Sequence, residues 1–431
     1  MNNETLFEFV THRQKIINIL RCNSTIEKTV LTKKMDISFP TLINQLKELK
    51  KRNILLDDSK TDLNPSAFYL CGISIGGAQC KMTLIDAKYN VLSQKAFNEI
   101  CEKYSVFQQS FFKSLQNIQT DYGYRYFDTP DDETTLKLRL NAILKDIIKL
   151  HDISEENELP PILSIGIAIT GSIDAKKQII ISSHNVEYLK NISKEMLFSP
   201  DLLQTLRKKQ IHIIIDHNAK ALAVCEKYSL YQSDNINNEY HNKRNVASFY
   251  LGSGIGCGLI MDNKLIRGCR NLNGELGHIQ VPRHPNVVRT SFEQTLCSCG
   301  ANNCLEHYII CDVFQMTREK FKRASSNDII AYLNKLSPNE KTEKLEILGY
   351  YIGWSIDLVI KLLNVGLIIF SGKMTCFMDE LWQYITSSVG SIDSGALDCA
   401  MVISKYGALA PTIGAGILSN YPANYSIVWY E

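Results

Sequence analysis

The sequence predicts an α/β protein of two similar halves, preceded by a small, basic helical head. Apolar strands that end in glycine recur in both halves, at 68–77 and 163–171 and again at 245–254 and 365–372. Helical patterns alternate with these strands, which is typical of sheets that are covered by helices. The head differs because residues 12–52 combine short amphipathic helices with many Lys and Arg side chains.

The head is expected to form a winged helix-turn-helix domain over residues 1–66. Apolar side chains at helical spacing predict helices over 13–21 and 27–34, and Ser38 can cap a third helix that runs to about residue 50. The segment 52–68 then predicts two strands joined by a turn, which would be the wing.

The charge of the head indicates a polyanionic partner. Between His12 and Asn53, ten Lys or Arg side chains accompany three acidic ones, a charge of +7. The whole chain carries only +2, so the body is acidic in sum. Helix-turn-helix proteins place their third helix in the major groove of operator DNA. The alternative is a small helical subdomain with a solvated basic face.

Polar side chains of this head are the candidates for contacts with DNA. Asn and Gln can pair with adenine edges, and Lys contacts phosphate or guanine. The candidates are Lys33, Ser38, Thr41, Asn44, Gln45 and Lys47.

The body is expected over residues 67–431, with a first lobe to about residue 220 and a second lobe beyond it. After the strand at 68–77, the first lobe is expected to contain strands at 81–86 and 89–94 that continue a meander, a long helix over 133–150, and strands at 163–171 and 211–216. The second lobe is expected to contain a hairpin of 245–254 with 258–266, and later strands at 365–372 and 400–404. Ligands of such sheets bind beyond the carboxyl ends of the strands, so we expect a cleft between the lobes.

One histidine and three cysteines predict a metal site. The histidine ends the run G-E-L-G-H, and after eighteen further residues the cysteines follow at C-x-C-x4-C spacing. These four residues are His278, Cys297, Cys299 and Cys304. Four such donors suit a closed tetrahedral zinc site, which is structural rather than a water activator. Glu275 and Glu306 are tethered to the ligands, so zinc would fix two carboxylates that can accept hydrogen bonds from sugar hydroxyls.

Other features of the chain are less specific. No run of about 18 apolar residues and no signal-peptide block is present, so we expect a cytoplasmic protein without a membrane-spanning helix. The remaining cysteines are scattered and are expected to be buried thiols. A glycine-rich turn at 251–258 would let backbone amides approach a polyanion, but such turns are equally common in hairpins.

Taken together, these motifs resemble the ROK family of repressors, open reading frames and sugar kinases. The resemblance covers nearly the whole chain and rests on GIAITGSID at 166–174, DHN at 216–218, LGSGIGCG at 251–258, GELGH at 274–278 and CSCGANNCLE at 297–306. It implies a duplicated, actin-like or ribonuclease-H-like sugar-kinase fold with two lobes and a cleft. An N-terminal winged helix is typical of the family's xylose-repressor-like transcription factors and absent from its plain sugar kinases.

The resemblance also implies roles for individual residues. It assigns zinc to the histidine and the three cysteines named above. It assigns contacts with sugar hydroxyls to Asn185, Asp216, Glu275, His278 and Glu306. Asp216 matches the carboxylate that acts as general base in the family's kinases. Gly252, Ser253 and Gly254 match a phosphate-binding loop of the family.

The departures from the family pattern concern ATP above all. Ser74 stands where the first phosphate motif has the aspartate that helps to organise magnesium, and Ala78 stands where it has a threonine. Phosphoryl transfer depends on positioning and charge neutralisation, so losing this carboxylate should cost about 10²–10³ in rate. Lys373 replaces one of two glycines and would intrude where adenosine should lie. On the sugar side, Ile215 replaces an asparagine.

We therefore expect a sugar-responsive transcription factor, a repressor rather than an enzyme, in which Asp216 is a vestigial base and residues 252–254 a vestigial phosphate loop. Its partners would be operator DNA and a monosaccharide or sugar derivative, and it would act as a homodimer or homotetramer. The sugar would close the two lobes and change the spacing of two DNA-binding heads.

Two alternatives stay open. One is an ATP-dependent sugar kinase with an accessory DNA-binding domain, against which Ser74 and Ala78 count. The other is a DNA-binding regulator that has lost sugar sensing and responds to a protein partner, for which Ile215 is the only hint.

Overall fold

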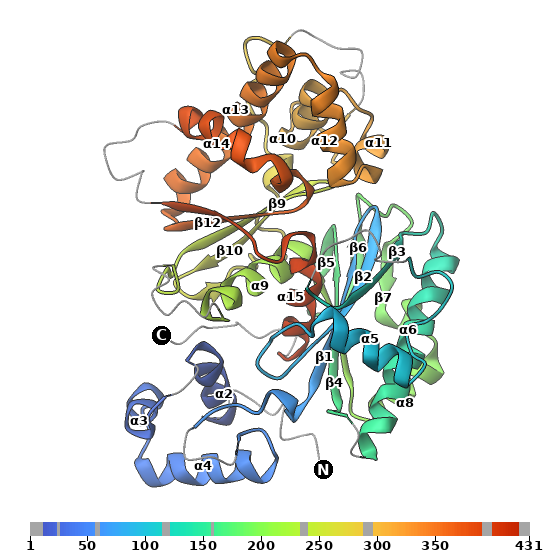
Figure 1. Cartoon of the computed structure of the whole chain (residues 1–431), viewed down its shortest axis with the longest axis vertical. Coiled ribbons are helices and arrows are strands. Elements are labelled where there is room, and N and C mark those ends of the chain that lie inside the picture. Colours follow the sequence, from blue (N-terminus) through green and yellow to red (C-terminus); the bar gives the residue numbers. More distant parts are fainter. Residues whose placement is uncertain are drawn as a thin grey trace.

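The structure of the chain is a computed structural model. It describes residues 12–23, 26–56, 61–113, 121–156, 159–232, 240–287, 296–389 and 399–421 (Figure 1). Within these ranges, no helix has the length and apolar character that crossing a membrane requires.

The head contains the three predicted helices, α2 (His12–Cys22), α3 (Lys28–Met35) and α4 (Phe39–Lys51). The Ser38 hydroxyl caps α4 by accepting a hydrogen bond from the amide of Thr41 at 3.3 Å. A small apolar core holds the helices together, with side chains such as Ile16, Leu31 and Leu42 fully buried. The wing predicted at 52–68 is represented by one antiparallel bridge between Leu55 and Leu63, and its turn at 57–60 lies outside the described residues.

The first lobe is built on a mixed sheet of five strands. In spatial order these are β3 (Tyr124–Asp128), β2 (Gln79–Ile85), β1 (Tyr69–Ile75), β4 (Ile162–Ile169) and β8 (His212–His217). The first three are antiparallel, and β1, β4 and β8 are parallel. Helices α5 (Gln94–Lys103), α6 (Glu133–Glu155) and α8 (Pro200–Lys208) lie on the outer side of this lobe (Figure 1).

The prediction that 89–94 continues the meander was wrong. That segment forms only isolated bridges, at Val91 and Ser93, and the third strand comes instead from Tyr124–Asp128. The reason is local, because the Ser93 hydroxyl accepts a hydrogen bond from the amide of Ala96 and starts helix α5 at Gln94. A smaller sheet of β5 (Ser172–Asp174), β6 (Ile179–Ser182) and β7 (Lys190–Ser193), followed by α7 (Lys194–Leu197), extends the lobe towards the cleft.

The second lobe repeats the strand order of the first. Its sheet runs β11 (Lys264–Leu265), β10 (Ile255–Met261), β9 (Val246–Leu251), β12 (Leu367–Ser371) and β13 (Ala400–Ile403), again with hairpin partners on one side and parallel strands on the other. Helices α13 (Pro338–Leu363) and α14 (Met378–Ser388) pack on its outer face. The short helices α10 (Leu305–Tyr308), α11 (Arg318–Arg323) and α12 (Ser326–Lys335) lie above it in Figure 1. The predicted duplication is therefore confirmed.

Helices α9 (Asn218–Gln232) and α15 (Ala410–Ser419) lie between the two sheets (Figure 1). Glycines allow this approach. A Cβ on Gly166 of β4 would lie 1.7 Å from the carbonyl oxygen of Ala415, and one on Gly414 would lie 1.8 Å from that of Ala221. No side chain fits at such separations, so the backbones of sheet and helix are in direct contact.

The head packs against the ends of these two helices through a buried polar cluster. The Tyr421 hydroxyl, just beyond α15, donates to Asn18 Oδ1 of α2 at 3.0 Å and lies 2.7 Å from the Tyr228 hydroxyl of α9. Arg21 of α2 donates to the carbonyl of Ala87 at 3.0 Å and stacks 3.9 Å above the ring of Tyr89. We call five of these residues the head–body cluster, namely Asn18, Arg21, Tyr89, Tyr228 and Tyr421. Each of their side chains is less than a tenth exposed.

Gly166→Ala is expected to destabilise the fold by about 3 kcal/mol or more, because the new methyl group would overlap the backbone of α15. Gly256→Ala is the matched control, since a Cβ there would meet only Ala219 Cβ at 3.9 Å. Urea unfolding followed by circular dichroism measures both. Equal midpoints for the two variants would contradict the close packing of α15 on β4.

Candidate functional site

The four predicted metal ligands lie together in the second lobe. Their donor atoms, one from each of His278, Cys297, Cys299 and Cys304, all lie within 4.8 Å of one another. His278 Nδ1 is 3.4 Å from Cys297 Sγ, and Cys299 Sγ is 3.5 Å from Cys304 Sγ. A zinc tetrahedron with bonds of about 2.3 Å has edges of roughly 3.8 Å. The donor set and its spacing therefore fit a zinc ion.

Backbone pairing brings these ligands together across the chain. Gln280 and Cys304 form an antiparallel bridge, and the amide of Leu305 donates to the carbonyl of Ile279 at 3.0 Å. Burial alone would raise the pKa of Cys297, but hydrogen bonds with His278 and with the backbone of Cys299, together with the charge of His278, outweigh it and lower that pKa to about 6. A thiol of this kind is readily deprotonated, as a metal ligand must be.

A cavity of about 70 Å³ adjoins the metal cluster and lies between the two lobes. Most of the predicted ligand-binding residues line it, namely Asn185, Ser253, Gly254, Glu275, His278 and Glu306. Other lining residues carried no prediction, among them His184, His217, Asn218 and Arg318. Asp216 and Gly252 are not part of its wall. The structure thus gathers side chains from β-strand ends, α10 and α11 at one point.

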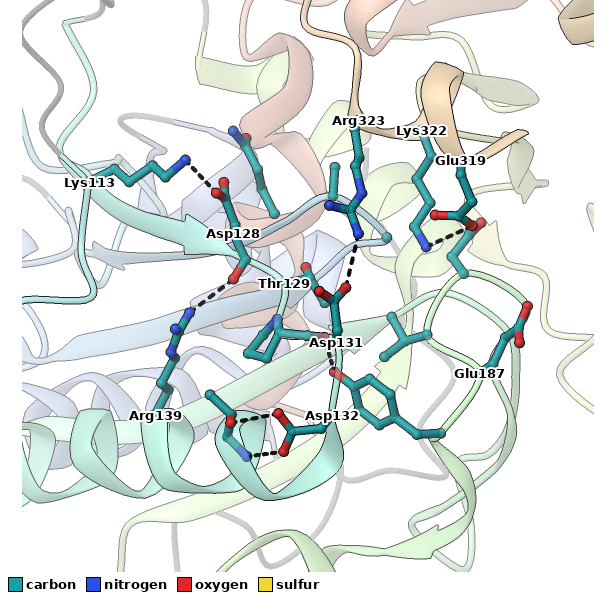
Figure 2. Close-up of a pocket in the computed structure, with 18 residues that line it drawn as sticks. Lys113, Asp128, Thr129, Asp131, Asp132, Arg139, Glu187, Glu319, Lys322 and Arg323 are labelled. Carbon is teal, nitrogen blue, oxygen red and sulfur yellow. Dashed lines mark hydrogen bonds and ion pairs between the residues drawn. The ribbon is translucent and has the colours of Figure 1, made fainter. Parts of the chain in front are cut away.

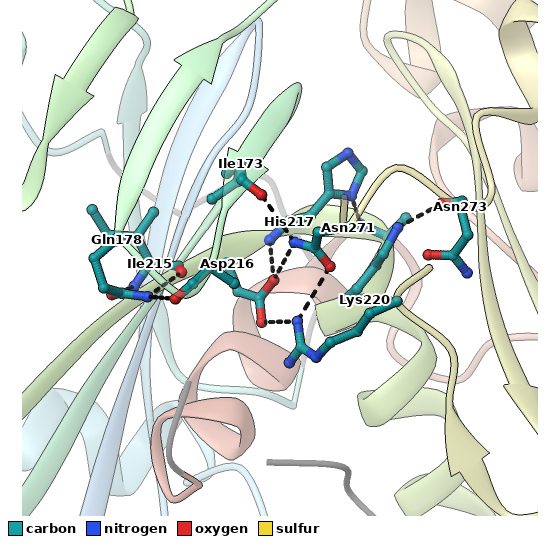
Figure 3. A network of polar contacts seen from close by, with 11 residues as sticks. Ile173, Gln178, Ile215, Asp216, His217, Lys220, Asn271 and Asn273 are labelled. Carbon is teal, nitrogen blue, oxygen red and sulfur yellow. Dashed lines mark hydrogen bonds and ion pairs between the residues drawn. The ribbon is translucent and has the colours of Figure 1, made fainter. Parts of the chain in front are cut away.

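Asp216 is engaged in pairing beside the cavity (Figure 3). Its Oδ2 lies 2.6 Å from Arg267 Nη1, and its Oδ1 accepts from Asn271 Nδ2 at 3.2 Å and from the amide of His217 at 2.7 Å. The neighbouring Ile215, which replaces the family's asparagine, is held through its backbone by the side chain of Gln178. A carboxylate with this many partners has little capacity left for another hydrogen bond.

The ring of His217 lines the cavity directly. Its Nδ1 accepts from the amide of Ala219 at 3.0 Å, and burial, aided by Lys220, lowers its pKa to about 3. The ring is therefore neutral and carries its proton on Nε2, which lies 3.5 Å from Glu275 Oε1. Burial raises the pKa of Glu275, and His278 and Lys220 oppose that effect. In the sequence, His217 stands directly after the strand-end aspartate, within the DHN motif at 216–218, but no contact with a ligand was predicted for it.

Glu306 is 4% exposed, lines the cavity and contacts the glycine-rich turn at 251–258. Its Oε2 accepts a hydrogen bond from the amide of Ile255 at 2.8 Å. A Cβ on Gly254 would lie 2.7 Å from the same oxygen, so any larger residue there would push the Glu306 carboxylate aside. Among the residues that line the cavity, Asn218 Oδ1 is a buried acceptor that receives no hydrogen bond. Glu306 Oε1 receives no hydrogen bond either, but the Arg318 guanidinium lies 3.1 Å from it as an ion-pair partner. Such atoms are costly unless a ligand or water pairs with them.

Arg318 spans the cavity from α11. Its Nη2 donates to Asn185 Oδ1 at 3.2 Å and lies 3.1 Å from Glu306 Oε1. The guanidinium therefore joins a residue of the first lobe to one of the second. No motif surrounds Arg318 in the sequence, so pattern reasoning had no means of finding it.

Two of the residues that departed from the family's ATP pattern, Ser74 and Lys373, have internal partners. The Ser74 hydroxyl lies 2.7 Å from the Thr412 hydroxyl of α15. A Cβ on Gly77 would lie 2.7 Å from Lys322 Cε, so the Lys322 side chain covers this first glycine turn. The Lys373 ammonium donates to the carbonyls of Phe321 and Ala324, the latter at 2.9 Å, and burial lowers its pKa to about 8.

A larger cavity of about 760 Å³ opens beside this first glycine turn (Figure 2). Its wall is highly charged, but the charges pair with one another. Arg323 lies 3.0 Å from Asp131, Lys322 lies 3.6 Å from Glu319, and Lys113 pairs with Asp128. The cavity thus offers a polar space without an excess of one sign.

The candidate DNA contacts lie on α3, α4 and the residue that caps α4. Lys33, Asn44 and Lys47 are exposed, whereas Thr41 and Gln45 are half-buried. Gln45 Oε1 accepts from Arg13 Nε at 2.7 Å, and the Ser38 hydroxyl serves as the helix cap. The exposed side of α4 therefore presents a mixture of amide and ammonium groups.

Comparisons with known proteins agree with this architecture. A model of the ROK family matches residues 70–421. The xylose repressor of Bacillus subtilis (strain 168) is 24% identical over 428 residues, which cover 96% of this chain and 95% of that protein. The xylose repressor of Caldicellulosiruptor bescii is 24% identical over 319 residues, 72% of this chain and 65% of that protein.

A solved structure described as a ROK family transcriptional regulator and homologue of the E. coli MLC protein has a TM-score of 0.64. It is 16% identical and covers 96% of this chain and 97% of its own. The similarity confirms the predicted α/β, sugar-kinase-like fold. With the family model matching most of its length, the chain belongs to the ROK family.

Proposed function

We propose that this protein is a sugar-responsive transcriptional repressor. The observation that carries the proposal is the course of α9. The helix begins with Asn218 at the cavity and reaches the head–body cluster through Tyr228 near its other end. A single rigid element thus connects a ligand site with a basic helical head. The full-length similarity to a xylose repressor supports the same conclusion.

The head is proposed to be a winged helix-turn-helix that binds operator DNA. Its three helices, the capped α4 and the bridge between Leu55 and Leu63 have the order of that motif. Exposed Asn44 and Lys47 would lie toward the major groove and Lys33 toward phosphate. A homodimer or homotetramer would engage two half-sites about 34 Å apart.

The inter-lobe cavity is proposed to bind a monosaccharide or sugar derivative. Asn218 Oδ1, a buried acceptor that receives no hydrogen bond, matches the hydroxyl donors of a sugar. Glu306 Oε1 is a second buried acceptor of this kind, and the Arg318 guanidinium lies 3.1 Å from it. Asn185, Glu275 and His278 add further polar groups at the wall. Asp216 would act on the sugar only after release from Arg267, so we regard it as support for the wall rather than a direct contact.

The cysteine and histidine cluster is proposed to bind structural zinc. The ion would neutralise the thiolates and fix the loop that leads into Glu306, while His278 reaches the cavity wall beside it. It would supply no open position for catalysis.

We infer that the protein does not transfer phosphate. The carboxylate that would serve as base, Asp216, is already engaged by Arg267, by Asn271 and by the amide of His217. Ser74 bonds to α15, and the Lys322 side chain lies on the turn where phosphate would sit. Ser74 and Lys322 therefore stabilise the fold instead of leaving room for a nucleotide.

DNA binding is expected to weaken when the effector sugar is added. Fluorescence anisotropy measures this response. The DNA would come from the region upstream of the protein's own coding sequence, and the sugars would be D-xylose, D-glucose and N-acetyl-D-glucosamine.

Lys47→Ala should weaken DNA binding with or without sugar and lower the slope of log affinity against log salt by about 1. Glu275→Gln should bind DNA like the wild type and lose the response. DNA affinity that no sugar changes would contradict sugar sensing, and no DNA affinity would contradict the repressor assignment.

Zinc is expected at about one ion per chain in purified protein, measured by atomic emission. Cys299→Ser should lower the zinc content well below that value and lower the melting temperature, because only three donors remain. Cys376→Ser is the control, since Cys376 is an exposed thiol outside the cluster. Wild-type zinc content in Cys299→Ser would overturn the ligand assignment.

A further inference from the structure

The guanidinium of Arg318 stands between the two polar groups that face each other across the inter-lobe cavity. Asn185 belongs to the first lobe, in the loop between β6 and β7, and Glu306 belongs to α10 of the second lobe. We propose that Arg318 is an internal competitor of the effector, which must displace it from both partners in order to bind. The proposal rests on the sugar-binding function proposed above and adds the residue that sets its affinity.

The size of the cavity requires this displacement. At about 70 Å³ it has room for a few water molecules, and it lies well below the roughly 300 Å³ at which pockets for small molecules begin. A pentose or hexose cannot enter while Arg318 lies between Asn185 and Glu306. Arg318 has the longest flexible side chain in the wall and is partly exposed, so it is the side chain that must leave.

The different exposure of Glu306 and Arg318 allows a sugar to replace Arg318 at the Glu306 carboxylate. The Glu306 side chain is 5% exposed, so its carboxylate cannot lose a cation without receiving another donor. The Arg318 side chain is 25% exposed and can return its charge to water. Sugar hydroxyls would supply donors to Glu306 Oε1 and to Asn185 Oδ1, so both oxygens exchange one partner for another.

Displacement would also weaken the contact between lobes. Helix α11 is anchored in the second lobe by Lys373, which donates to the carbonyls of Phe321 and Ala324. Within the described residues, its contacts with the first lobe include Arg318 to Asn185, Lys322 against Gly77, and Arg323 to Asp131. When Arg318 leaves, α11 stays with the second lobe and one of these three contacts is lost. The effector would thus weaken the attachment of α11 to the first lobe, in addition to any closure of the two lobes.

The test is the sugar affinity of Arg318→Ala in the full chain, by isothermal titration calorimetry with D-xylose, D-glucose and N-acetyl-D-glucosamine. Removing a charge-assisted competitor should raise the affinity for the sugar that binds by about tenfold or more. Arg318→Gln, which keeps the length and helix-forming character of the side chain, should show a smaller gain. Arg323→Ala is the matched control, because it removes an exposed inter-lobe ion pair from the same helix without touching the cavity.

The outcomes separate this proposal from the function on which it rests. Tighter binding by Arg318→Ala than by both wild type and Arg323→Ala supports the internal competitor. Weaker or unchanged binding by Arg318→Ala overturns it and leaves sugar sensing intact, since Arg318 would then contact the sugar or play no part. No binding of any sugar by the wild type and all three variants overturns both proposals. A melting temperature near the wild-type value shows in each case that the variant is folded.

Discussion

The structure depends on the direct backbone contact of α9 and α15 with each other and with the two sheets. Glycines at the contact points remove the side chains that would otherwise hold these layers apart, as at Gly166 against Ala415 and Gly414 against Ala221. Close-packed layers of this kind do not deform continuously, so they move as units or not at all. Because α9 starts at the cavity and the head–body cluster joins its far end to α2, a displacement at one site has a rigid route to the other.

The polar groups in and around the cavity make contacts that hold the two lobes and α11 in place. The charge of Glu306 is balanced by Arg318 and by the amide of Ile255, which lies in the glycine-rich turn at 251–258. The same loop in a kinase would offer its amides to a nucleotide. Here one amide is committed to a carboxylate, Ser74 is committed to α15, and Lys373 is committed to α11. The Ile255 amide, Ser74 and Lys373 therefore stabilise the relative positions of the lobes and of α11.

Sequence reasoning reached the parts of the structure that depend on local pattern. The cysteine spacing located a cluster whose donors lie within 4.8 Å, and the glycine-ended strands predicted two sheets of the same order. Helix α4 and its Ser38 cap followed from local capping rules. The strand Tyr124–Asp128 was missed because its place in the sheet is fixed by pairing with β2, far away in sequence, whereas the segment 89–94 had an equally apolar pattern.

The features of the site that sequence did not yield are those set by pairing across the fold. Asp216 stands where the sequence resemblance places a catalytic base. Its carboxylate is instead paired with Arg267 and Asn271, which lie more than fifty residues further along the chain. Arg318 lies in a short helix without a motif, and only the approach of the two lobes brings it to Asn185. Charge pairs between distant segments leave no periodicity or spacing in the sequence.

The central claim is that the state of the cavity reaches the head through α9, α15 and the head–body cluster. Hydrogen–deuterium exchange of the full chain, with and without a sugar that raises its melting temperature, tests this most directly. The account predicts altered exchange at the cavity and also in α2 and the end of α15, around Asn18 and Tyr421. Altered exchange confined to the cavity and α11, with α2 unchanged, would contradict it.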